Sequence, residues 1–166
     1  TGPTIVALPP PPPSSGFGGG GGGGGGAPAG PGVTALGLFT NDEGLFNLAA
    51  LVKSEDNLVN LTIAKGVRAR TKEDGALKSI RIVQIDNLPL PPTGSRFSGA
   101  QYDCGPDGAT FAPPISLTLF YDPAKLPQDI DIDSLTIGVL NVPESRWDSL
   151  PSSHNKTDRS LTASIG

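Results

Sequence analysis

Three aspartates alternate with isoleucines in the last third of the chain, at Asp129, Asp131 and Asp133. In an extended backbone alternate residues share a face, so the three carboxylates would project on one side about 7 Å apart. That spacing is too wide for one ion held by these groups alone, but it suits Ca²⁺ bridged with backbone carbonyls or with groups of a neighbour. The alternative is a solvated loop before the next strand. Calcium at these residues is the one cofactor that the sequence suggests.

Nucleophilic catalysis needs a Ser, Thr or Cys beside a base, and the chain has a single histidine, His154. It stands in the polar segment 152–156, which we expect to be a solvated loop. No HExxH or CxxC motif occurs, and the long glycine run lacks both the following helix and the Lys of a phosphate-binding loop. We therefore expect a protein that is not an enzyme.

Three further residues could carry covalent modification. Asn60 and Asn155 each begin an Asn-x-Thr acceptor sequence for N-glycosylation, and Asn155 is the better candidate because it lies in a predicted loop. Cys104 is the only cysteine, so it cannot form an internal disulfide. It is either a small buried residue, an intermolecular disulfide or a reactive thiol.

The charge pattern bears on partners and location. The net charge is −4, and the 12 Lys and Arg residues are spread singly, which argues against nucleic acid as a partner. No apolar run approaches the 18 to 20 residues that would span a bilayer, so we expect no membrane insertion. The chain has no Met and starts at a Thr, from which we expect an exported, extracellular protein that has lost a signal segment.

Short apolar segments with turn residues between them dominate the chain after residue 32. The clearest lies at 115–121, where Ile115, Leu117 and Leu119 alternate with polar residues. Further strands are expected at 33–40, 45–53, 58–64, 79–86, 97–104, 135–140, 146–150 and 161–165. This spacing predicts an all-β fold, an antiparallel two-sheet sandwich with Ig-like or Greek-key connections, over residues 33–166. We expect one core that contains Leu117, Leu119, Ile137, Val139 and Trp147.

Part of this region resembles a known module. The segments GPDGATFAPPISLTLFYDPAKLP, DIDIDSLTIGVLN, RWDSLPS and LTASI resemble, in order, a β-sandwich module of large prokaryotic cell-surface and secreted proteins. The resemblance covers roughly residues 33–166 and implies a non-enzymatic extracellular fold. The module continues past its Thr-Ala-Ser strand, whereas this chain stops at Gly166, so we expect the sandwich to lack its closing strand.

The amino-terminal segment, residues 1–32, has a different composition. It carries no charged side chain and contains one strand-like stretch formed by Thr4, Ile5, Val6, Ala7 and Leu8. Five prolines follow, which favour an extended polyproline II rod, and then nine consecutive glycines. The first stretch is a strand without a partner of its own, joined to the sandwich by a long arm.

Two function classes agree with these features. In the first, the chain is a subunit of an extracellular filament or surface fibre, a homo-oligomer that grows head-to-tail as the amino-terminal strand of each copy enters the next copy. In the second, it is a surface module, tethered by the arm, that binds a glycan or a protein. Only the first has a use for residues 4–8.

Overall fold

The computed structural model describes residues 4–8, 30–86, 89–91, 93–97, 99, 101–141 and 144–166. Strands make up 49% of the chain and helix 5%, which confirms the all-β class. The helical residues are two three-residue 3-10 turns, η1 (Pro123–Lys125) and η2 (Ile132–Ser134). Within the described ranges no helix has the length or the apolar character of a membrane span.

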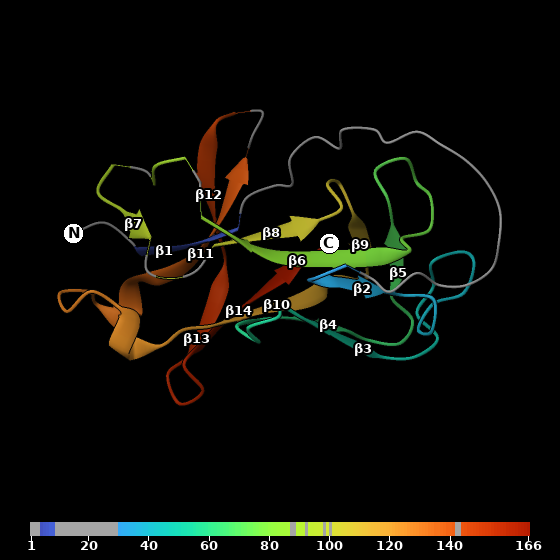
Figure 1. Cartoon of the computed structure of the whole chain (residues 1–166), viewed down its shortest axis with the longest axis horizontal. Helices are drawn as coiled ribbons and strands as arrows, with labels where there is room; N and C mark the ends of the chain where they lie inside the picture. The colour runs from blue at the N-terminus through green and yellow to red at the C-terminus, as the bar shows by residue number, and fades with distance from the viewer. Residues whose placement is uncertain are drawn as a thin grey trace.

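The described strands form several sheets (Figure 1). The largest is antiparallel and contains, in spatial order, β13 (Ser152–Asn155), β14 (Ser160–Ile165), β10 (Ile115–Phe120), β4 (Val59–Ile63) and β3 (Ala50–Lys53). A second contains β12 (Arg146–Leu150), β11 (Leu135–Asn141), β1 (Thr4–Leu8) and β7 (Arg96–Phe97). A third contains β2 (Val33–Ala35), β6 (Ser79–Ile85) and β8 (Gln101–Gly105), and β5 (Arg68–Arg70) pairs with β9 (Thr110–Ala112).

The core is organised around β10, whose alternation was the strongest strand signal in the sequence. Leu117 and Leu119 are 1% and 2% exposed, and each lies opposite apolar residues on both neighbouring strands. Ile137 of β11 is fully buried in the same cluster, to which β3, β4, β6, β8 and β14 also contribute. Val139 packs against the cluster while remaining partly exposed. Four of the five expected core residues are therefore confirmed.

Trp147 is the exception, and the strand register explains it. Trp147 of β12 lies opposite Leu140 of β11, whereas the core-facing residues of β11 are Leu135 and Ile137. Successive side chains point to opposite faces, so Trp147 belongs to the other side of the sheet. There its ring meets Phe97 edge to face at 5.3 Å, and its indole N–H donates to the carbonyl oxygen of Leu90. The expectation that Trp147 shares the main core is wrong.

Other boundaries also differ from those expected. The segment 33–40 is a strand only to Ala35, and its Leu36–Thr40 part turns back on itself because Phe39 and Thr40 both donate backbone hydrogen bonds to Leu36. The expected turn at 41–44 is present, and the returning strand begins only at Ala50. Strands β5, β9 and β13 were not expected, and β13 replaces the predicted loop around His154.

Candidate functional site

The amino-terminal strand β1 lies inside a sheet rather than at its edge. It pairs in parallel with β11 over five positions, from Thr4 opposite Leu135 to Leu8 opposite Val139. On its other side it pairs in parallel with β7, with Ile5 opposite Phe97. Figure 1 shows β1 between β11 and the β7–β8 region. We call the space between β11 and β7 the strand slot. Because β1 is parallel to both neighbours, this sheet is mixed and not purely antiparallel.

The strand slot has a physical requirement for an occupant. Without β1, the facing edges of β11 and β7 would present rows of unpaired amide and carbonyl groups, which is costly when buried and hazardous when exposed. The occupant is joined to the rest of the fold only by the proline and glycine arm. Residues 9–29 of that arm lie outside the described residues, as does the polyproline rod expected there.

The open position differs from the one expected from the sequence. We expected the sandwich to lack a strand after residues 161–165. The structure instead places β14 between β10 and β13, so both edges of the last strand are paired. The position that β1 fills is next to β11, the strand that the sequence places at 135–140.

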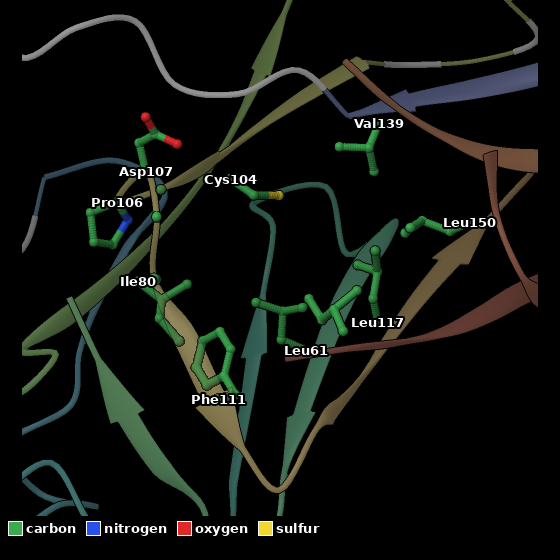
Figure 2. A pocket seen from close by; sticks show the side chains of 13 residues that line it. Leu61, Ile80, Cys104, Pro106, Asp107, Phe111, Leu117, Val139 and Leu150 are labelled. Atoms are coloured by element: carbon green, nitrogen blue, oxygen red, sulfur yellow. The ribbon is translucent and has the colours of Figure 1, made fainter. Parts of the chain in front are cut away.

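A cavity of about 260 Å³ opens where the strand slot ends (Figure 2). Its wall is apolar and includes Leu61, Leu117, Leu150 and Ile165, with Val139 at the end nearest β1. Figure 2 shows the side chains of Leu61, Leu117 and Leu150 converging, while the carboxylate of Asp107 points away from them. The segment from Gly105 to Ala109 forms another part of the wall, together with Ile80 and Phe111. Such a lining suits apolar groups and offers little to a charged ligand. We call this cavity the slot pocket.

Cys104 lines the slot pocket from β8. Burial raises the pKa of its thiol to about 12, assisted by the Asp103 carboxylate and opposed by Arg81. A thiol with this pKa is protonated at neutral pH and is a weak nucleophile. These properties favour the structural role for Cys104 over the reactive one.

The three aspartates of the metal hypothesis have separate partners. The Asp129 carboxylate forms an ion pair with the Arg96 guanidinium at 2.8 Å. The hydrogen bond within this pair lowers the pKa of Asp129. Asp131 does not continue an extended strand but caps η2, accepting from the backbone N–H of Asp133. Asp133 pairs with Lys156 at 2.6 Å. No group of three potential ligands forms among the described residues, and calcium binding remains a prediction.

The structure brings Asp133 to a cluster that the sequence did not reveal. The hydroxyl of Tyr121 lies 2.7 Å from Nε2 of His154, and Nδ1 of the same ring is 4.0 Å from the Asp133 carboxylate. The hydrogen bond from Lys156 lowers the pKa of Asp133, and the same contact raises the pKa of Lys156. His154 is only 16% exposed, so the expectation of a solvated loop histidine is wrong. The cluster ties the β13–β14 hairpin to η2 and to the end of β10.

The two glycosylation sequences are placed differently. Asn60 is half-buried near the start of β4, with its side-chain oxygen enclosed. Asn155 is exposed at the tip of the β13–β14 hairpin. Its side-chain oxygen accepts from the backbone N–H groups of Thr157 and Asp158, which fixes the turn. Asn155 is the more accessible of the two, and glycosylation at either remains a prediction.

Comparison of the chain with protein-family models, with curated proteins and with solved structures found no match. The resemblance to a prokaryotic surface module therefore rests on the sequence segments named above and remains a hypothesis.

Proposed function

We propose that the chain is the structural subunit of an extracellular filament, a homo-oligomer that grows head-to-tail by strand insertion. The observation that carries the proposal is the pairing of β1 with β11 and β7, because the occupant of the strand slot is connected to its own fold only through residues 9–29. An identical strand from a second copy would make the same pairs. Each subunit would then give one strand and receive one, and such a head-to-tail contact builds an open filament when the rotation between copies does not close a ring.

Two further features belong to the proposal. Residues 33–166, completed by β1, form a two-layer sandwich with Ig-like or Greek-key connections, in which β2, β6 and β8 continue the sheet of β1, β11 and β12. The support is the shared core of β4, β6, β8, β10, β11 and β14, together with the position of β1 beside β8. The location is extracellular, the role is not enzymatic, and neither nucleic acid nor membrane insertion is involved.

The competing state is a monomer that fills the strand slot with its own β1. Because the two states make the same strand pairs, the balance depends on the effective concentration of the tethered strand. Short flexible linkers give effective concentrations in the millimolar range, and a linker that cannot reach its site gives almost none. The five consecutive prolines stiffen the arm beside Leu8 and lower the chance of folding back. This stiffness favours the neighbouring copy.

The test uses Ile5→Pro in the full chain. The backbone of Ile5 lies between β11 and β7, where a proline removes a hydrogen-bond donor in the middle of a sheet. We expect wild-type filaments in negative-stain electron microscopy at subunit concentrations up to about 1 mM, monomers of Ile5→Pro by size exclusion, and binding of a synthetic Thr1–Leu8 peptide to that variant. Ala29→Pro, in the arm, is the matched control and should still form filaments.

Filaments assembled from the Ile5→Pro protein would refute strand insertion. A wild-type protein that stays monomeric throughout this concentration range would favour the alternative, a tethered adhesion or binding module closed by its own β1.

A further inference from the structure

The slot pocket lies where the sheets of the described structure meet. The five-stranded sheet supplies Leu61, Leu117 and Ile165 to its wall, and the sheet of β1 supplies Val139 and Leu150. The rest of the wall comes from the β2–β6–β8 and β5–β9 sheets and from the turn that follows β8. Figure 2 shows the leucines of this wall directed toward a shared space. The pocket is therefore a gap in the packing between the layers.

The strands of the wall leave little backbone with which a peptide could pair. Strands β4, β10 and β14 each pair on both sides within the five-stranded sheet, and β11 pairs with β12 and β1. A peptide that adds to a sheet needs an unpaired strand edge. These four strands present side chains to the pocket and keep their hydrogen-bonding edges for each other. Such a wall suits a small molecule better than an inserted strand.

The charges around the pocket select against charged ligands. The lining residues that the structure describes include no Lys, Arg or His, so no cation is available to bind an anionic group. Asp107 belongs to the lining, but its carboxylate points away from the apolar side chains. Burial raises the pKa of the Cys104 thiol to about 12, so this group is uncharged at neutral pH. A charged ligand would lose its hydration here without gaining a partner.

The volume of the pocket sets the size of the ligand. A dry cavity of roughly 150 Å³ lined by Leu, Ile and Phe takes up benzene. The slot pocket measures about 260 Å³, and scaling by volume gives a ligand of about ten non-hydrogen atoms. Side chains that line an empty space lose dispersion contacts on that side, and an apolar occupant restores them.

We propose that the slot pocket is a binding site for one uncharged, apolar small molecule of about ten non-hydrogen atoms. The ligand lies against Leu61, Leu117 and Leu150, and Cys104 forms part of its wall. This site does not depend on the proposed filament, because β1 makes the same strand pairs whether it comes from its own chain or from a second copy.

Equilibrium dialysis of the full chain tests the proposal and works equally for monomers and filaments. The two probes are para-methylacetophenone and para-toluate, which both have about ten non-hydrogen atoms, whereas only toluate is charged at neutral pH. We expect one ketone molecule per chain with a Kd of about 0.1 to 1 mM. Binding of toluate should be weaker by about tenfold or more. Absence of ketone binding up to about 5 mM, or equal binding of the two probes, would overturn the proposal.

Two substitutions at one position locate the bound ketone. Cys104→Phe fills part of the pocket and should weaken ketone binding by about tenfold or more. Cys104→Ala is the matched control, because it leaves the space open and should keep the Kd within about twofold of the wild type. Unchanged ketone binding by a folded Cys104→Phe protein would show that the ketone binds elsewhere, which overturns the proposal.

A second measurement on the wild type covers the case in which Cys104→Phe does not fold. A ketone molecule in the pocket covers the Cys104 thiol, and ketone at about four times its Kd leaves about one fifth of the pockets free. Labelling of Cys104 by a small maleimide should therefore slow by about fivefold, whereas toluate at the same concentration should leave the rate unchanged. A labelling rate that the ketone does not alter would contradict the proposed site.

Discussion

Replacing Arg81 by Met should destabilise the fold in a pH-dependent way. Arg81 of β6 forms a 2.5 Å ion pair with Asp103 of β8, whose side chain is only 3% exposed. The second carboxylate oxygen of Asp103 has no hydrogen-bond partner in the described structure. Burial raises the pKa of Asp103, and the guanidinium of Arg81 is the main influence that opposes this rise. Removing Arg81 leaves a buried carboxylate without its cation.

The size of the effect follows from the burial of the two partners. Breaking a fully buried pair costs about 3 to 5 kcal/mol, while exposed pairs contribute about 0 to 1 kcal/mol. The Asp103 end is buried and the Arg81 side chain is 37% exposed, so solvent screens part of the interaction. We expect a loss of about 2 to 4 kcal/mol at pH 7. Arg70→Met, whose partner Asp74 is 90% exposed, should cost less than about 1 kcal/mol.

The sign of the pH dependence can be worked out from the direction of the pKa shift. A carboxyl whose pKa is higher in the folded state than in the unfolded state holds its proton more tightly when folded, so stability falls as pH rises through that interval. Without Arg81 the folded-state pKa of Asp103 rises further, because the influence that lowered it is gone. The destabilisation should therefore be largest at neutral pH and smaller near pH 4.5.

Urea unfolding followed by Trp147 fluorescence at pH 7 and pH 4.5 measures both quantities. Asp103→Asn in the Arg81→Met background should recover part of the loss at pH 7, since it removes the unpaired charge. A destabilisation of Arg81→Met that is equal at the two pH values, or greater at the lower one, would refute the reasoning.

Two other predictions concern the core and the acidic segment. Leu119→Ala should lower the free energy of unfolding by about 2 to 5 kcal/mol, because Leu119 packs between Val59 and Leu161. Thr118→Ala, on the opposite face of β10, should lower it by about 1 kcal/mol. Equal melting temperatures for Leu119→Ala and the wild type would show that β10 is not part of the core. A thermal scan with Ca²⁺ or with chelator tests the calcium hypothesis for Asp129, Asp131 and Asp133. We expect equal transitions, since Arg96 and Lys156 already neutralise two of these carboxylates, and a higher transition with Ca²⁺ would establish a site.

The sequence predicted the central strands because their pattern is local. In β10 and β14 apolar residues recur at every second position, and this period specifies both the strand and its buried side. The strand at residues 4–8 was also predicted from a local signal, which is a run of β-branched and apolar residues that prolines end. For these elements the secondary structure depends on neighbouring residues only.

Register and partner choice depend on residues far apart in the chain, and only the tertiary structure decided them. Trp147 lies outside the core because β12 pairs with β11 in a register that places Trp147 opposite Leu140. His154, Tyr121 and Asp133 come together only because β13 folds against β14 beside η2, although the three are well separated in sequence. The strand slot forms in the same way, from β11 and β7, which lie on the two sides of β1 in the sheet. Alternation fixes which face of a strand is apolar, but the strand that covers an edge is selected by long-range packing and backbone pairing.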